Sequence, residues 1–454
     1  MTEKDTKKIS FLLIGNLIIV LGYIFSNGFY FVQGLFLIAI AFLLLLLFHK
    51  IDFVKMTWDI DMLTLVKLNL VLFVSLSLIM YGGFYQNNSH YLVTLSKILL
   101  IVAAMFSFLY IFNFSKWLPF FSKFKFWFLF LVALFLRLFM TWSSPSPYID
   151  VFSIQRIAPR ALLEGNNPYS IIYPQMYKGE ISDVYSYGPG VILMDAPAVL
   201  LTGDPRYTMV LAEIGTGFLI YLILGYKNKL GSNKTLQEIL PLVFLYNPRS
   251  LFIIEQAWVD PLLIFLITLF VSLLFIWKKN LWAFMVLGVA VATKQYTVFL
   301  LPFLFNGKFL KLRNAIVVVG VFAIITIPFL LWNFKDFLRD VVLYQLTIQR
   351  SRYDSLSFNS LFYNLTGSDI PKGAVVLFNL FVLTYLLRAQ KKLVASSVML
   401  SASVLSLSTF LIYRLAFIHY YYFASSLLFL SIVLIAYESV NGSKPSKINV
   451  KGKE

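Results

Sequence analysis

The chain has 454 residues; 59% of them are hydrophobic, 13% are charged, and none is cysteine. Soluble globular proteins carry about 25% charged residues. The composition therefore excludes a water-soluble surface, a disordered chain and a fibrous repeat, and favours a protein that lies mostly in lipid. The lack of cysteine excludes disulfides, thiolate metal sites and cysteine nucleophiles. Basic cytoplasmic loops explain the net charge of +17, so no nucleic-acid partner is expected.

Apolar runs of about 20 residues, long enough for a membrane-spanning helix, recur along the whole sequence. They lie at 10–28, 30–48, 62–82, 92–113, 126–142, 207–226, 236–254, 260–277, 314–332, 372–388, 393–412 and 417–437. Two more apolar stretches are ambiguous from hydropathy. Residues 187–202 are broken by two prolines and Asp195, and residues 281–305 are interrupted at Lys294.

Loop charge resolves both stretches. Lysines before the first span place the N-terminus in the cytoplasm. The cytoplasmic side then holds about twice as many Lys and Arg residues as the outside, provided that 187–202 lies on the outer surface and 281–305 forms two short spans. The sequence predicts an all-α polytopic protein of the cytoplasmic membrane, with about 14 transmembrane helices and both termini cytoplasmic.

Two long segments, 143–206 and 333–371, fall outside the membrane in this topology. The cytoplasmic loops, in contrast, are short and almost purely basic. Long loops in a compact protein are usually functional. We therefore expect an extracytoplasmic active site.

Asp150 follows the end of a span, in a turn rich in Tyr and Pro. A carboxylate at the water–lipid boundary serves as an ion-pair partner or as a general base. Residues 151–164 have the pattern of an amphipathic surface helix, which ends before Pro168 because the residue before proline disfavours helix. Tyr169 and Tyr187 are candidate sugar-binding residues of this loop. The simpler alternative is an interfacial loop with Tyr and Pro as membrane anchors.

Two carboxylates, Glu255 and Asp260, fall at an outer hairpin between spans. Asp260 precedes a proline, so it can simply cap the following helix. Glu255 has no such structural role, and ionisable groups near the membrane are functional candidates. We take both as candidates for binding the acceptor or the sugar.

Cations gather at the outer ends of several spans, against the trend of the cytoplasmic loops. The candidates for binding a donor phosphate are Lys294, Arg350, Arg352, Arg414 and His419, and Gln349 beside them is a candidate for binding the acceptor or the sugar. Lysine is a compact cation and arginine makes bidentate contacts with phosphate. The alternative for any single residue is snorkelling or contact with lipid headgroups. Convergence of several loops favours an anionic ligand.

A carboxylate and several cations on one membrane face suggest a reaction on a phosphate-bearing lipid. The carboxylate would deprotonate an acceptor hydroxyl as a general base. The cations, or a carboxylate-bound divalent metal (Mg, Mn or Ca), would stabilise the leaving phosphate. No cofactor is certain from the sequence.

From about residue 124 to 437 the chain resembles the GT-C superfamily of integral-membrane glycosyltransferases. It is most similar to polyprenyl-phosphate-mannose-dependent mannosyltransferases, protein O-mannosyltransferases and aminoarabinose transferase. The matching pieces, in family order, are LFLRLFMTW, ALLEGNNPY, YSYGPG, YNPRSLFIIEQAWVDPLLIFL, GVAVATKQYTVFLLP, LTIQRSRYDSLSFNSL and RLAFIHYYYF.

The resemblance implies inverting transfer of a sugar, mannose or another hexose or pentose, from a polyprenyl-phosphate donor to a glycan, lipid or protein hydroxyl. It implies that Asp150 activates the acceptor, that Lys294 lies beside the donor phosphate, and that 187–202 is a juxtamembrane helix. Some relatives have an Asp-Asp or Asp-Glu pair where this chain has a single Asp150.

The resemblance divides the chain into three parts: a four-helix region at 1–123 without an assigned role, a catalytic core at 124–437 and a basic cytoplasmic tail at 438–454. Three other functions stay open. One is a polysaccharide polymerase or ligase with diphosphate-linked donors. Another is a lipid flippase or transporter, and the third is a membrane scaffold.

Overall fold

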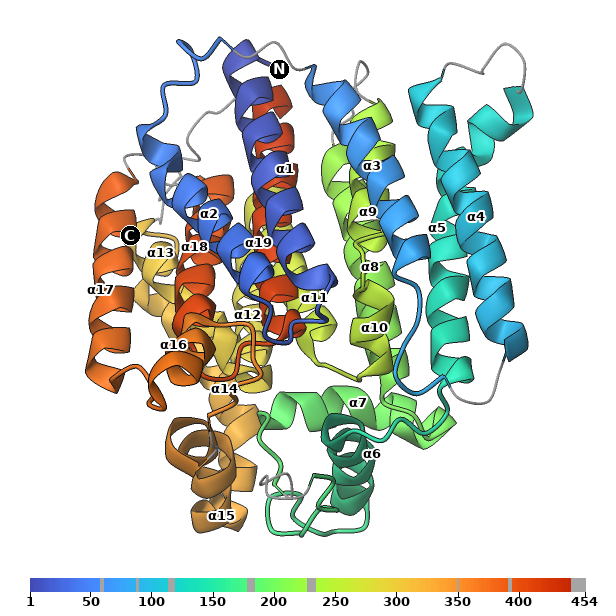
Figure 1. The fold of residues 1–454 in the computed structure, drawn as a ribbon. Helices are drawn as coiled ribbons and strands as arrows, with labels where there is room; N and C mark the ends of the chain where they lie inside the picture. The colour runs from blue at the N-terminus through green and yellow to red at the C-terminus, as the bar shows by residue number, and fades with distance from the viewer. Residues whose placement is uncertain are drawn as a thin grey trace.

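The computed structural model describes residues 1–57, 61–86, 90–112, 119–177, 184–226, 234–348, 351–390 and 394–441. Within these ranges the chain is almost entirely helical, and its only β-type pairing is an isolated bridge between Phe29 and Ser355. Figure 1 shows a bundle of long helices with one end covered by α6 (Asp150–Leu163), α7 (Pro189–Thr202) and α15 (Phe334–Leu338). We call this the capped end, and the opposite one the far end.

The remaining helices form the bundle and its connections. Before the first long loop lie α1 (Glu3–Ile24), α2 (Val32–Leu46), α3 (Met62–Ile79), α4 (His90–Ile111) and α5 (Pro119–Ser143). After it follow α8 (Arg206–Gly225), α9 (Lys234–Leu245), α10 (Ser250–Glu255), α11 (Asp260–Val271), α12 (Asn280–Thr293), α13 (Leu301–Asn306) and α14 (Leu312–Trp332). The chain closes with α16 (Phe358–Thr366), α17 (Lys372–Ala389), α18 (Ala395–Ile412) and α19 (Ile418–Asn441). Short 3-10 or π segments are η1 (Leu47–Lys50), η3 (Ser272–Ile276), η4 (Gln295–Leu300) and η5 (Arg339–Ile348).

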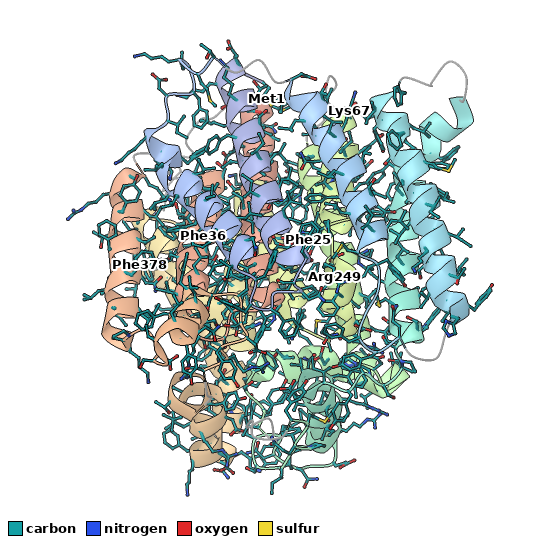
Figure 2. The ribbon with its side chains drawn as sticks, viewed as in Figure 1. Met1, Phe25, Phe36, Lys67, Arg249 and Phe378 are labelled. Carbon is teal, nitrogen blue, oxygen red and sulfur yellow. The ribbon has the colours of Figure 1, made fainter. Side chains whose placement is uncertain are left out.

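Ten helices in the described part of the chain are long and apolar enough to cross a membrane. This confirms a multi-pass, all-helical protein, because a helix satisfies its own backbone hydrogen bonds in lipid. Exposed Phe36 and Phe378 lie on the flank of the bundle (Figure 2), where lipid would cover them. The count of about 14 spans stays a prediction, because several apolar runs fold as short or interrupted helices.

Two interruptions shape the bundle. At the first, α12 ends at Thr293, and Lys294 has an extended backbone with φ −150° and ψ 141° before η4 begins. The sequence predicted this break. At the second, between α9 and α10, Arg249 has a left-handed φ of 70°. Such a conformation is uncommon for a residue with a side chain and persists where the surroundings hold it.

The helix α7 lies across the capped end rather than along the bundle (Figure 1). The backbone amide of Gly188, just before α7, donates to the carbonyl of Thr293 at 3.1 Å. The start of α7 is thereby fixed against the end of α12. The other part of the first long loop forms α6, which matches the surface helix predicted for 151–164.

A buried polar network ties four helices together inside the bundle. The Nε of Arg137 in α5 donates to Glu213 Oε2 in α8 at 2.8 Å, and the Nη2 of Arg137 donates to the carbonyl of Leu245 in α9 at 2.7 Å. Tyr422 in α19 donates its hydroxyl to Glu213 Oε1 at 2.6 Å. Charges in this environment must be paired, so we assign Arg137 a structural role.

The first four helices pack directly on the rest of the bundle. α1 packs against α2 and α19, while α3 packs against α4 and α9. Tyr23 donates its hydroxyl to Asn247 Oδ1 at 2.9 Å, and Ser77 donates to the carbonyl of Tyr246 at 3.1 Å. These helices therefore share their interior with the later ones.

Candidate functional site

A cavity of about 770 Å3 lies at the capped end of the bundle. Its walls come from the α1–α2 and α3–α4 connections and from the two long loops at 143–206 and 333–371. The chain around α10, α12 and α19 completes them. This volume lies in the usual range of small-molecule sites, about 300–1,000 Å3. Of the residues selected from the sequence, those that line the cavity are Asp150, Tyr187, Lys294, Arg352 and His419.

Asp150 is the first residue of α6 and follows Ile149, whose backbone is extended. One carboxylate oxygen accepts a hydrogen bond from the backbone amide of Val151 at 2.8 Å. Burial raises the pKa of Tyr177, and the negative charge of Asp150 raises it further. Asp150 is the only carboxylate among the described residues that line the cavity. Asp150 thus lies at the cavity wall near the phenols of Tyr85 and Tyr177, where a substrate hydroxyl can reach its carboxylate.

Lys294 points from the break after α12 toward the start of α11. Its Nζ lies 3.1 and 3.0 Å from the two carboxylate oxygens of Asp260. The ammonium also lies 4.3 Å from the ring centroid of Tyr296, and 5.7 and 5.9 Å from those of Tyr187 and Tyr420. Both charged groups are buried, so neither is a solvated surface charge. Asp260 is the first residue of α11, and Val259 holds the N-cap position.

His419 lies near the start of α19 and is 8% exposed. Its ring centroid is 4.5 Å from that of Trp258. Its Nδ1 is buried and has no hydrogen-bond partner within the described ranges. Buried polar atoms are usually paired, so an imidazole nitrogen of this kind at a cavity wall is suited to a ligand.

Arg352 joins the second long loop to the segment before α19. Its Nε and Nη2 donate to Asp354 at 2.8 and 2.7 Å, and its guanidinium lies 5.1 Å from the Phe417 ring. Its backbone amide donates to the carbonyl of Arg414 at 3.0 Å. Arg414 thus contributes its backbone to this junction, and it is not among the cavity-lining residues.

The other candidate residues lie behind the cavity wall or outside the described ranges. Tyr169 is fully buried and donates its hydroxyl to the carbonyl of Tyr187 at 2.9 Å, so it supports Tyr187 from behind. Burial raises the pKa of Glu255, which is also buried and accepts hydrogen bonds from a neighbouring loop. Gln349 and Arg350 lie outside the described residues.

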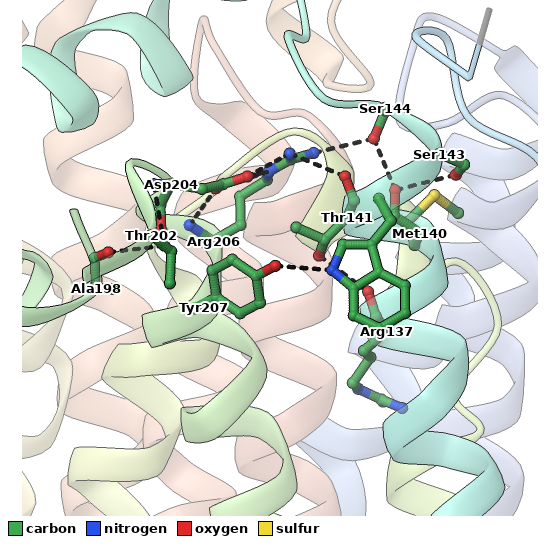
Figure 3. A network of polar contacts seen from close by, with 11 residues as sticks. Arg137, Met140, Thr141, Ser143, Ser144, Ala198, Thr202, Asp204, Arg206 and Tyr207 are labelled. Carbon is green, nitrogen blue, oxygen red and sulfur yellow. Dashed lines mark hydrogen bonds and ion pairs between the residues drawn. The ribbon is translucent and has the colours of Figure 1, made fainter. Parts of the chain in front are cut away.

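An arginine-centred network holds the chain that leads to Asp150. Arg206 is fully buried; its Nη1 donates to Ser144 Oγ at 2.9 Å and its Nη2 to the carbonyl of Thr141 at 3.1 Å. Its Nε donates to Asp204 Oδ1 at 3.0 Å. Figure 3 shows this network between the end of α5 and the start of α8. The segment from Ser144 to Asp150 therefore starts from a fixed point.

A family model for glycosyltransferase family 87 matches residues 185–436, which is more than half of the chain. The chain belongs to glycosyltransferase family 87. This is a family of GT-C-type integral-membrane glycosyltransferases, so the predicted superfamily and the predicted enzyme class are confirmed. The comparisons with curated proteins and with solved structures found no match.

Some residues around the cavity of this glycosyltransferase lie inside the matched segment, and others precede it. Lys294, Asp260, Arg352 and His419 lie inside the matched segment. Asp150 precedes it, as do the cavity residues of the α1–α2 and α3–α4 connections.

The described residues of the cavity offer a single carboxylate, Asp150, and no protein cage for a divalent metal. Within the described ranges, no group of three or more His, Asp or Glu side chains could hold a metal ion. Ca²⁺ takes about six to eight oxygen ligands, and Mg²⁺ held by one carboxylate relies on waters and substrate phosphates for the rest, so these residues alone do not make a metal site. We therefore assign no step to a metal.

Several aromatic lining residues of the glycosyltransferase were not selected from the sequence: Tyr85, Tyr177, Trp258, Tyr296 and Tyr420. Trp258 and Tyr420 lie within motifs that also hold candidate charged residues, EQAWVD and IHYYYF. Their position next to charged residues at the outer end of a span was the sequence signal by which these aromatic residues could have been selected. Tyr85 had no such signal, because its charged neighbours in space are distant in sequence.

Proposed function

We propose that this glycosyltransferase moves a sugar from a polyprenyl-phosphate donor to a hydroxyl acceptor on the outer face of the cytoplasmic membrane. One observation carries the proposal: a single cavity is lined by the carboxylate of Asp150 and by the basic side chains of Lys294, Arg352 and His419. A general base and a cationic site for a leaving phosphate are what this reaction needs.

The reaction is a single displacement at the anomeric carbon. The acceptor oxygen forms a bond to C1 of the donor sugar while the bond from C1 to the phosphate oxygen breaks. Asp150 takes the proton of the acceptor hydroxyl, and the polyprenyl phosphate leaves with the electron pair. Attack from the face opposite the leaving group inverts the configuration at C1.

Lys294 and His419 are placed to receive the departing phosphate. Asp260 holds the Lys294 ammonium through two contacts of 3.1 and 3.0 Å. The cation is therefore in position before the reaction, so it needs little reorganisation as negative charge develops on the phosphate. Asp260 acts in this proposal as a positioning residue for Lys294.

An apolar edge beside Lys294 suits the lipid part of the donor. Val341 and Val342 of η5 line the cavity, and Val342 is exposed. Gln295, the residue after Lys294, donates from its side chain to the carbonyl of Val341 at 3.2 Å. A polyprenyl chain could leave the cavity across these valines while its phosphate stays at Lys294.

The capped end is the outer face in this proposal. Met1 and Lys67 lie at the far end of the bundle (Figure 2). The cytoplasmic side of a membrane protein carries the excess of Lys and Arg, and the lysines of the N-terminus belong to that end. This orientation places the cavity outside the cytoplasm.

The test is transfer of radiolabelled sugar from a panel of polyprenyl-phosphate sugars in membranes, with intact protein and Asp150→Asn. We expect the variant to lose about 10²- to 10⁴-fold in transfer rate, because the general base is removed. Asp52→Asn is the matched control, since Asp52 is exposed and does not line the cavity. Unchanged turnover in Asp150→Asn would remove Asp150 from this role. No transfer from any monophosphate donor would instead favour a diphosphate-linked polymerase or ligase, or a transporter.

A further inference from the structure

The first four helices contribute to the cavity although the sequence assigned them no role. Asn27 and Phe29 from the α1–α2 connection, and Phe84 and Tyr85 from the α3–α4 connection, line it together with Asp150. We propose that these two connections form the acceptor subsite, which binds a saccharide ring of the acceptor beside Asp150. This inference rests on the transfer reaction proposed above.

The α1–α2 connection is seated on the start of α19. Gly28 has a φ of 76°, and a Cβ atom there would lie 1.9 Å from the backbone nitrogen of Ile418. The backbone amide of Tyr30 donates to the carbonyl of Asp354 at 2.7 Å. Asn27 and Phe29 are thus held against the residue that precedes His419.

The α3–α4 connection is clasped by two charged side chains of the core. Arg249 Nη1 donates to the carbonyls of Met80 and Gly82 at 2.6 and 2.8 Å. The backbone amides of Phe84 and Tyr85 each donate to Glu255 at 2.9 Å. Figure 2 places Arg249 in the half of the bundle nearer the capped end. Arg249 is one of the few residues other than glycine with a left-handed backbone in the described chain.

The clasp also explains a glycine in this connection. A Cβ atom on Gly83 would lie 1.9 Å from Glu255 Oε1. A side chain at this position would require the Glu255 carboxylate to shift, and the shift would disturb its hydrogen bonds to Phe84 and Tyr85. Glu255 and Arg249 act here as positioning residues, because they hold Phe84 and Tyr85 at the cavity.

Four phenylalanines form a continuous aromatic wall of the cavity: Phe252, Phe84, Phe29 and Phe417. Ring centroids are 5.0 Å apart for Phe84 and Phe252, 6.4 Å for Phe29 and Phe84, and 5.7 Å for Phe29 and Phe417. Phe29 and Phe84 are 38% and 48% exposed. The N-terminal helices thus supply the exposed centre of the aromatic wall.

Polar groups edge the aromatic wall. The Oδ1 of Asn27 is buried and has no hydrogen-bond partner within the described ranges. Burial raises the pKa of Tyr85, as do the negative charges of Glu255 and Asp150, so its phenol stays protonated near Asp150. Asn27 and Tyr85 can therefore hydrogen-bond to a ligand at the edge of the aromatic wall.

This combination fits a sugar ring rather than an alkyl chain. A sugar has C–H faces that pack on aromatic rings and hydroxyl edges that need hydrogen-bond partners. An alkyl chain would leave the Oδ1 of Asn27 without a partner, and burial of an unpaired polar group is costly. A ring bound at the aromatic wall would also present a hydroxyl to Asp150, as the transfer requires.

The experiment measures equilibrium binding of octyl glycosides of mannose, glucose, galactose and arabinose to the full-length protein in nanodiscs, with octanol as the sugar-free probe. We expect saturable binding of at least one glycoside and no comparable binding of octanol. Phe84→Ala and Phe29→Ala should each weaken that binding about tenfold, which corresponds to roughly 1.4 kcal/mol. Phe25→Ala is the matched control, because Phe25 is exposed next to the α1–α2 connection and does not line the cavity.

Two results would overturn the subsite: no binding of any glycoside, or glycoside binding that Phe84→Ala and Phe29→Ala leave unchanged. The proposed reaction fails separately, in the transfer assay. Glycoside binding that depends on Phe84, together with no transfer from a polyprenyl-phosphate sugar, would leave the saccharide subsite standing and reject the reaction.

Discussion

The two sides of the cavity are built by different means. On the side that the family model covers, Lys294 and Asp260 form a buried pair at 3.0 Å, and His419 packs on Trp258. On the N-terminal side, Phe29 and Phe84 are partly exposed rings, held mainly through backbone hydrogen bonds of their own loops. The first side holds charged groups at set positions, whereas the second holds an aromatic surface.

In the proposed reaction, this difference separates the chemistry from the choice of acceptor. A leaving phosphate requires cations at set positions, and a change there affects every acceptor alike. Because the loop with Phe84 is held through its backbone amides, its side chains can differ without disturbing the clasp. Under the proposed acceptor subsite, the two N-terminal connections are where specificity can change while the core reaction is kept.

The largest expected effect comes from the buried pair. Lys294→Met leaves Asp260 as an unpaired buried carboxylate, so it should destabilise the protein by about 3–5 kcal/mol. It should also raise the donor KM by roughly ten- to a hundredfold, the value of one charged hydrogen bond to phosphate. Thermal unfolding in detergent and steady-state transfer measure the two effects.

A double variant distinguishes folding from function at this pair. Lys294→Met with Asp260→Leu removes both charges, so most of the lost stability should return. The donor KM should stay high, because no ammonium remains at the cavity. Recovery of the donor KM together with stability would show that the pair is structural only.

The sequence was informative where a charge interrupted apolar residues. Lys294 could be selected for that reason, and Asp150 and His419 because they lie at the outer ends of spans; all three line the cavity. The partner of Lys294 could not be found in this way, because Asp260 is 34 residues earlier. A pairing across that distance depends on how α11 and α12 pack, which hydropathy does not describe.

The aromatic wall was hidden by composition. Phe29 and Phe84 are two of 46 phenylalanines, and neither has a charged neighbour in sequence that marks it. Their position depends on the contacts of Gly28 with α19 and of Gly83 with Glu255. The count of about 14 spans stays a prediction; hydropathy showed 236–254 as one apolar run, whereas the structure forms α9 and α10 there, with left-handed Arg249 between them.

A smaller effect is expected from the clasp. Glu255→Gln keeps the shape but leaves one of the amides of Phe84 and Tyr85 facing an NH2 group. It should weaken glycoside binding about threefold to tenfold, a loss on the order of 1 kcal/mol. Glu164→Gln is the control, since Glu164 is exposed at the end of α6. An equal rise in donor KM and in glycoside Kd would contradict a role confined to the acceptor side.

The smallest effect is expected behind Tyr187. Tyr169→Phe removes the hydroxyl that donates to the carbonyl of Tyr187 at 2.9 Å. The loss of one such hydrogen bond is about 0.5–1.5 kcal/mol, so stability and donor KM should change modestly. Tyr148→Phe removes a similar hydrogen bond, to the carbonyl of Met176, at an exposed site. A larger effect in Tyr148→Phe than in Tyr169→Phe would contradict the support assigned to Tyr169.

The most direct test of the account is to measure donor and acceptor KM in parallel for two proteins, Phe84→Ala and the double variant Lys294→Met/Asp260→Leu. The account predicts that Phe84→Ala raises the acceptor KM about tenfold with the donor KM unchanged, and that the double variant raises the donor KM with the acceptor KM unchanged. Equal increases of both constants in both proteins would contradict a cavity divided into a donor side and an acceptor side.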